Sequence, residues 1–192
     1  MDIQWRNLDN VPPHRFVCGY CGAHTGPNRG YYPEGHRSDQ CTDGTYRTIY
    51  ICTYCESPTY FLGEQQTPGV ATGNPLKHLP AIVAEAYDEA RKCMSVGAYT
   101  AASLLCRKLL MNVAVAEGAK PGEHFIVYVN YLDSSGYIPP KGKPWVDRIR
   151  DLGNIATHEI KITNQPDAEQ ALTFIEMLLS FVYEMPGRLA NP

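Results

Sequence analysis

Four cysteines occur as two pairs with the same spacing. The first pair is Cys18 and Cys21, the second is Cys52 and Cys55, and thirty residues separate the two pairs. Two residues between cysteines let both thiolates of a tight turn face one ion, and two such turns supply the four soft ligands of a tetrahedral zinc site. Because four thiolates leave no open coordination position, the pattern predicts a structural Zn²⁺ and not a catalytic one.

Three further side chains lie between the two pairs and are alternative ligands. They are Cys41, His24 and His36, and any of them could replace one of the four cysteines. A redox-active thiol pair is the competing interpretation. In thioredoxin-like redox proteins the thiol pair is present once, where a strand meets a helix. Here the spacing is present twice, in a segment rich in β-branched and aromatic residues, so zinc is the favoured prediction.

A second candidate site lies on a helix predicted over residues 145–161. Arg150, Asn154 and His158 are spaced four apart and form a stripe on the polar side of this helix, opposite its apolar arc. Asn154 can therefore orient the His158 ring. A histidine beside an arginine is typical of sites in which the histidine activates a nucleophile or contacts a phosphate and the arginine stabilises the phosphate charge. The plainer interpretation is a solvated or subunit-contacting helix face.

A local basic cluster leads into this stripe. Lys141, Lys143 and Arg148 precede Arg150, with only Asp147 among them to oppose their charge. Such cations contact nucleic-acid phosphates, so we predict a local nucleic-acid-binding patch here. The whole chain has 17 Lys and Arg against 20 Asp and Glu, a formal charge of −3, which excludes a global basic field for nucleic acid.

Aromatic side chains accompany the cysteines. Tyr20, Tyr31, Tyr32 and Tyr54 all lie in the cysteine-containing half of the chain. Such rings could stack on unpaired bases. Their alternative role is to cover the metal site.

The two halves of the chain differ in residue pattern, and this difference predicts the fold. Residues 1–64 contain short strand-like runs between Gly and Pro, which predicts a small β-rich zinc ribbon. Residues 65–78 read as a Pro- and Gly-containing linker. Residues 79–192 have helical periodicity, with helices expected over about 80–95, 99–117, 123–132, 145–161 and 166–186. The predicted class is α+β, a ribbon followed by a bundle of four or five helices.

The seven cysteines come without a recognisable secretory signal at the start of the sequence. No apolar run approaches the roughly 20 residues that a membrane helix needs. We therefore expect a reduced, cytoplasmic protein without membrane contact.

Several short segments, taken in order behind the predicted ribbon, resemble a known family. They are Tyr87–Arg91, Gly97–Ala102, Arg107–Leu109 and Ile149–His158. They resemble a bacterial and phage family of unknown function that accompanies restriction and phage-defence proteins and is similar to the HEPN superfamily of helical bundles. The likeness covers about residues 79–184.

This resemblance implies a helical bundle that forms homodimers and, in catalytic HEPN proteins, a metal-independent endoribonuclease. It implies that His158 is a general acid or base, that Arg150 stabilises phosphate charge and that Asn154 is the polar residue that orients His158. Arg150 and His158 are about 12 Å apart along a helix axis, so two copies of the chain would have to meet to place both on one phosphate.

The leading functional prediction is thus an interaction with RNA in a host–phage conflict, with endoribonuclease activity as its enzymatic form. The alternative is a non-catalytic interaction or regulatory module. It would dock to a protein partner of a restriction or defence system through the polar face of the helix over residues 145–161. The net charge of −3 favours this alternative, and the basic cluster favours the first prediction.

Overall fold

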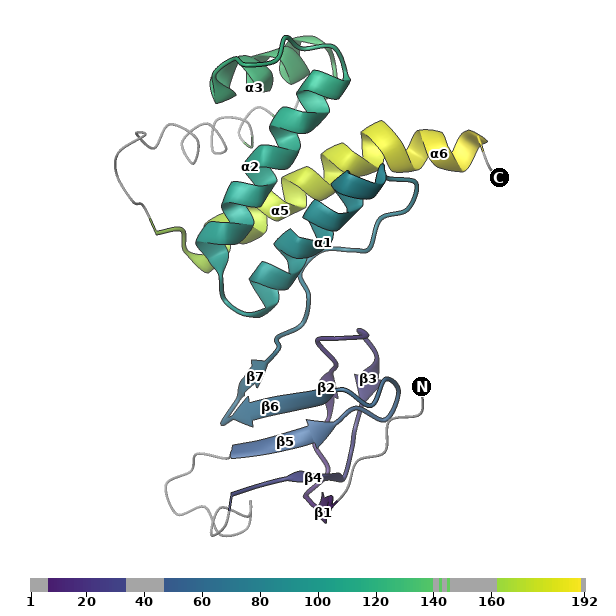
Figure 1. The fold of residues 1–192 in the computed structure, drawn as a ribbon, viewed down its shortest axis with the longest axis vertical. Coiled ribbons are helices and arrows are strands. Elements are labelled where there is room, and N and C mark those ends of the chain that lie inside the picture. The colour runs from purple at the N-terminus through teal and green to yellow at the C-terminus, as the bar shows by residue number, and fades with distance from the viewer. Residues whose placement is uncertain (1–6, 34–46, 140–141, 143–144, 146–161, 191–192) are drawn as a thin grey trace. The chain divides into compact units, whose positions relative to one another are not determined.

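The computed structural model describes residues 7–33, 47–139, 142, 145 and 162–190. The chain divides into two compact units, Met1–Ala71 and Thr72–Pro192. In the described residues the first unit contains strands and the second contains helices (Figure 1). The predicted α+β class is confirmed.

The first unit is built on a five-stranded antiparallel sheet with the strand order β1-β4-β5-β6-β7, and β2 and β3 form a separate hairpin. The strands are β1 (Asp9–Asn10), β2 (Phe16–Val17), β3 (His24–Thr25), β4 (Arg29–Tyr31), β5 (Arg47–Ile51), β6 (Pro58–Leu62) and β7 (Gln65–Thr67). In the central pair, Tyr50 lies opposite Thr59 and Thr48 lies opposite Phe61. All four side chains are buried, as expected for alternate residues on one face of a sheet.

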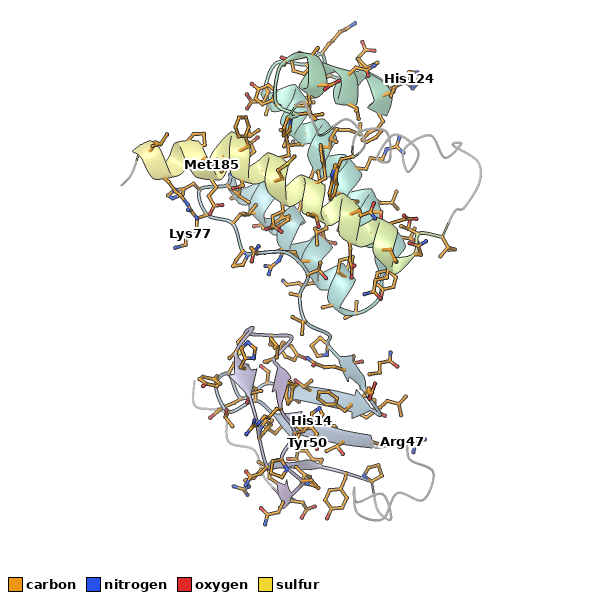
Figure 2. All side chains as sticks on the ribbon, turned by 180° about the vertical axis from the view of Figure 1, so that it is seen from behind. His14, Arg47, Tyr50, Lys77, His124 and Met185 are labelled. Atoms are coloured by element: carbon orange, nitrogen blue, oxygen red, sulfur yellow. The ribbon has the colours of Figure 1, made fainter. Side chains whose placement is uncertain are left out.

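The apolar core formed by the described residues of the first unit is small. Its buried apolar cluster consists of Val11, Tyr50 and Phe61, with Phe16 packed against it. The imidazole of His14 completes the cluster and lies beside Tyr50 (Figure 2). Its ring centroid is 5.3 Å from that of Tyr50 and 4.5 Å from that of Phe61. So few buried side chains give little hydrophobic stabilisation to the unit.

The first unit extends into residues predicted to form the linker. After a turn at Gly63, which has φ 59°, β7 pairs with β6, so that Gln65 lies opposite Leu62. The side chain of Gln66 then donates a hydrogen bond to the Val17 carbonyl at 2.9 Å. Residues 65–67 are therefore part of the sheet, because turn residues such as Gly63 reverse the chain without ending the pairing.

The described residues of the second unit contain four principal helices, and the helix predicted over residues 145–161 lies outside the described residues apart from Trp145. The four helices are α1 (Ala81–Ser95), α2 (Tyr99–Ala116), α3 (Phe125–Ser134) and α5 (Gln165–Leu179) (Figure 1). Gly97, with φ 77°, turns the chain between α1 and α2. The helices share one large buried cluster, at whose centre Leu110, Val113 and Leu172 are at most 1% exposed. Among the described residues, no helix is both long and apolar enough to cross a membrane.

The C-terminal helix continues further than the sequence predicts. We expected an end near Pro186, but α5 passes through a π-helical segment, η1 (Ser180–Glu184), into α6 (Met185–Ala190). In the π-helical spacing the N–H of Met185 donates to the carbonyl of Ser180, five residues back. Pro186 lacks an N–H, and the helix accommodates it directly after this change of spacing, near the start of α6.

Residues 72–78 of the predicted linker belong to the second unit and are hydrogen-bonded to its helices. The Arg91 guanidinium donates to the carbonyl oxygens of Thr72 at 3.2 Å and Gly73 at 3.0 Å. The Glu176 carboxylate accepts from the Asn74 side chain at 2.6 Å and from its backbone N–H at 3.1 Å. The segment Thr72–His78 is therefore a fixed part of the helical unit.

Glu184 holds the same segment further along the C-terminal helix. Its buried carboxylate accepts from the Lys77 backbone N–H at 3.3 Å and pairs with Arg188 at 3.0 Å. Burial acts to raise the pKa of Glu184, but hydrogen bonds from Lys77, Arg188 and Ser180 outweigh it and lower the pKa. The carboxylate is thus kept in its charged form.

Candidate metal centre

The structure brings together the four cysteines that the sequence predicts as ligands. The Sγ atoms of Cys18 and Cys55 are 3.7 Å apart and those of Cys21 and Cys52 are 3.8 Å apart. All four lie within 4.8 Å of one another. A tetrahedron with metal–sulfur bonds of about 2.3 Å has sulfur–sulfur edges of about 3.8 Å. The cluster therefore has the size and donor set of a four-thiolate metal site.

The two cysteine turns have the same hydrogen bonds to sulfur. The backbone N–H of Tyr20 donates to Cys18 Sγ at 3.4 Å, and the N–H of Tyr54 donates to Cys52 Sγ at 3.4 Å. Donors of this kind favour the charged form of a thiol. We call the turns Cys18–Gly22 and Cys52–Glu56 the two knuckles.

The backbone of the knuckles also repeats beyond the second cysteine. Gly22 donates its N–H to the Cys18 carbonyl at 2.9 Å, and Glu56 donates to the Cys52 carbonyl at 3.0 Å. Both residues have left-handed backbone angles, with φ 71° at Gly22 and 57° at Glu56. Glycine adopts this conformation without steric cost, whereas Glu56 adopts it against its intrinsic preference.

Neighbouring residues hold the knuckles in place. The first knuckle forms the end of the β2–β3 hairpin, and the second joins β5 to β6. Thr25 of β3 is buried, and its hydroxyl lies 2.9 Å from the hydroxyl of Thr53 and accepts the Thr53 backbone N–H at 3.3 Å. This contact links the hairpin directly to the second knuckle.

Gly19 allows a close backbone approach to the first knuckle. A Cβ at this position would lie 2.4 Å from the Gly69 carbonyl oxygen and 2.5 Å from that of Pro68. No side chain fits there, because the atoms in its way belong to the backbone.

The environment shifts the pKa of three of the thiols in different directions. Burial raises the pKa of Cys18, and burial together with the neighbouring thiols raises the pKa of Cys21 to about 12. Burial also acts to raise the pKa of Cys55, but hydrogen bonds from Ser57 and from the thiols of Cys21 and Cys18 outweigh it and lower the pKa to about 7. A metal must therefore displace protons to bind, and its affinity falls as the pH falls.

Most of the other predicted site residues cannot be placed. His24 is exposed on β3 and is not a member of the four-thiol group. The remaining predicted residues lie outside the described residues. They are the alternative ligands Cys41 and His36, the stripe Arg150, Asn154 and His158, and the basic residues Lys141, Lys143 and Arg148.

The ribbon tyrosines fall into two groups. Tyr20 is 58% exposed and Tyr54 is 71% exposed, and each occupies the third position of its knuckle. Tyr32 packs against the small core and Tyr31 is half-buried in β4. Of the four predicted stacking residues, Tyr20 and Tyr54 therefore present the most ring surface beside the metal site.

Comparison with protein families assigns the helical unit. Residues 88–191, more than half of the chain, match the model described as Domain of unknown function (DUF4145). The chain belongs to the DUF4145 family. The predicted membership of a family of unknown function is thereby confirmed. The matched region begins within α1 and does not include the four clustered cysteines. No curated protein and no solved structure significantly matches the chain.

The helical unit, which contains the DUF4145 match, also has a groove that the sequence analysis missed. It has a volume of about 610 Å³ and is lined by Tyr137 and by residues of the C-terminal helix. Three of these, Met177, Phe181 and Met185, are 39%, 52% and 56% exposed, and Leu189 follows at 86%. The signal that would have found them is their regular spacing of four residues, which continues past Pro186.

Proposed function

We propose that the protein binds single-stranded RNA and that its first unit is a zinc ribbon. The exposed tyrosine on each knuckle carries the RNA part of the proposal. Tyrosine rings at matching positions on two rigid turns offer flat apolar faces to unpaired bases, and stacking of this kind tolerates any base. The net charge of −3 implies that stacking contributes more of the affinity than long-range attraction does.

The zinc part of the proposal is supported by the four-thiol geometry. Bound Zn²⁺ would supply folding energy and hold the two knuckles together. Tetrahedral thiolate sites also accept iron, so the metal itself must be measured. We expect one zinc per chain in the purified protein by elemental analysis and no visible absorption band. A coloured iron protein, or a stoichiometry near zero, would overturn the assignment.

RNA binding is tested by anisotropy of a labelled single-stranded oligonucleotide with the zinc-loaded full chain. Tyr20→Ala and Tyr54→Ala are each expected to weaken binding by about 5- to 150-fold, since one stacked base contributes about 1–3 kcal/mol. The phenylalanine variants should retain affinity. Tyr60→Ala is the matched control, because Tyr60 is 37% exposed on β6 of the same unit. A wild type that fails to bind RNA at low salt would refute the proposal.

We extend the proposal to RNA cleavage on the basis of the resemblance and of the spacing of Arg150, Asn154 and His158. The full chain should cleave end-labelled single-stranded RNA without added divalent cations, and His158→Ala should abolish cleavage while retaining binding. His124→Ala is the control, because His124 is exposed and precedes α3 of the same unit. Absence of cleavage by the wild type would remove the catalytic extension and leave the binding proposal intact.

A second candidate function is protein interaction through the helical unit, with a second copy of the chain as the occupant. The apolar stripe Met177, Phe181, Met185 and Leu189 favours it. A step of four residues advances by about +40° in an α-helix and by about −30° in a π-helix, so η1 keeps the stripe on one side. A straight stripe on one helix can cover its own copy in a two-fold interface. Phe181→Asp should convert a dimer to a monomer in sedimentation equilibrium, and a monomeric wild type would exclude this function.

A further inference from the structure

A groove on the β2–β3 hairpin carries cationic and donor groups that the RNA proposal has not used. It has a volume of about 440 Å³ and is lined by Arg15, Phe16, Val17, His24, Thr25 and Gly26. Among the described residues, no acidic side chain lines it. By contrast, the groove beside the second knuckle contains Glu56 as well as Arg29. The hairpin groove is therefore suited to an anion.

Two of the polar side chains that line the groove are available to a ligand. Arg15 and His24 are both exposed. Within the part of the chain that the structure describes, neither has a hydrogen-bond or ion-pair partner. The Arg15 side chain passes close to Gly26, where an added Cβ would lie 3.5 Å from Arg15 Cγ. The strand register places Val17 opposite His24, so His24 in β3 lies across the hairpin from β2, which Arg15 directly precedes.

Contacts with other residues of the first unit hold the groove-lining residues in place. Thr25 is hydrogen-bonded to Thr53 of the second knuckle, and the Val17 carbonyl accepts the Gln66 side chain at 2.9 Å. Phe16 packs against the small core. A site whose walls are already ordered loses little conformational entropy when it binds a ligand.

We propose that this groove binds a backbone phosphate of the RNA strand whose bases stack on the knuckles, an inference that rests on the proposed RNA binding. The planar guanidinium of Arg15 donates hydrogen bonds to two oxygens of the phosphate, and the imidazole N–H of His24 donates to a phosphate oxygen as well. Tyr20 lies at the end of the same hairpin, between β2 and β3. One hairpin thus supplies a phosphate contact and a stacking ring to adjacent parts of one strand.

The salt dependence of RNA affinity tests this assignment with the zinc-loaded full chain and a labelled oligouridylate. Loss of one phosphate contact lowers the slope of log K against log salt by about 0.7 for a single strand. Arg15→Gln should show this change, together with about tenfold weaker binding at low salt. Arg29→Gln is the matched control, because it removes the same charge from an exposed side chain at the start of β4 in the same unit. Equal effects of the two variants, or no effect of Arg15→Gln, would overturn the proposal.

A second measurement separates failure of this site from failure of RNA binding. Inorganic phosphate and uridine monophosphate are titrated against labelled protein, with the Arg15 Nε–H and His24 ring signals observed by NMR. Shifts at these groups but not at Arg29, in a protein that does not bind RNA, would support a phosphate site and refute the RNA source. Equal affinity for a hexaglutamate peptide would refute phosphate selectivity. No shift with either phosphate probe would overturn the site.

Discussion

The two units are stabilised in different ways. Among the described residues, the buried apolar cluster of the first has three members, whereas that of the second has 23. Burial of apolar surface is the main favourable term in folding. The small cluster therefore leaves the first unit only marginally stable by itself, whereas the large cluster is sufficient to stabilise the second unit. On the proposed zinc assignment, a metal bound at the four-thiol site would replace a core in the first unit. The helical unit needs no such replacement.

The largest expected effect is selective unfolding of the first unit by Cys52→Ser. A structural zinc site contributes about 10–16 kcal/mol of apparent binding free energy, far more than three buried side chains can replace. The amide signals of the first unit should collapse to unfolded positions in a ¹⁵N correlation spectrum. The helical circular dichroism signal at 222 nm should be retained.

Cys93→Ser is the matched control for this experiment. Cys93 packs against the helical core and is not among the clustered thiols, so this variant should keep one zinc and both sets of signals. A Cys52→Ser protein with a fully dispersed spectrum would show that the small core suffices. The contrast between the two units would then be lost.

The helical unit is expected to depend on its buried side chains and not on the metal. Leu172→Ala removes a fully buried side chain from α5 and should destabilise the helical unit by about 2–5 kcal/mol, through lost transfer free energy and a residual cavity. Urea denaturation followed at 222 nm should show a lower midpoint, with zinc stoichiometry unchanged. Ile82→Ala, at a side chain that is 74% exposed on α1, should leave the midpoint nearly unchanged.

What the sequence predicted well depends on local patterns. Two identical spacings were enough to find the cysteine cluster, because each turn places its own pair of thiols. Helical periodicity gave the start of α2 at Tyr99 and brought the predicted start of α1 within one residue of Ala81. Both signals are contained within a few turns of chain.

What the sequence missed depends on contacts between distant residues. Residues 65–78 were read as a linker because Pro and Gly break helices, but Gln66 binds Val17 and Asn74 binds Glu176, 49 and 102 positions away. Composition indicates that such a segment is irregular and gives no sign of what it binds. Phe181 lies within the helix predicted over residues 166–186, but the sequence does not show which distant segments form a groove beside it, and the predicted end near Pro186 left out Leu189.

Gly19→Ala tests how tightly the metal site depends on its surroundings. The new methyl group would meet the carbonyl oxygens of Pro68 and Gly69, and neither can move without shifting the backbone. We expect the free energy of unfolding of the first unit to fall by about 1–3 kcal/mol. Because binding and folding are coupled there, the zinc affinity measured by chelator competition should fall by about 5- to 150-fold.

Gly26→Ala is the comparison variant in the same hairpin. A methyl group at Gly26 would make only an ordinary contact, 3.5 Å from the Arg15 side chain. Its zinc affinity should remain close to that of the wild type. If both alanine variants weakened zinc binding equally, the close approach at Gly19 would not be the cause.

The smallest effect concerns a single hydrogen bond at the start of α5. The Asn164 side-chain oxygen accepts the Asp167 backbone N–H at 2.9 Å and thereby satisfies one of the free donors of the first helical turn. Asn164→Ala should cost the helical unit about 1 kcal/mol, whereas Asn164→Asp keeps an acceptor and should cost little. A large cluster of buried side chains can absorb a loss of this size, so the denaturation midpoint should move without loss of cooperativity and with zinc affinity unchanged. A change in zinc affinity would mean that the stabilities of the two units are coupled, and the contrast between a metal-dependent unit and a core-dependent unit would have to be withdrawn.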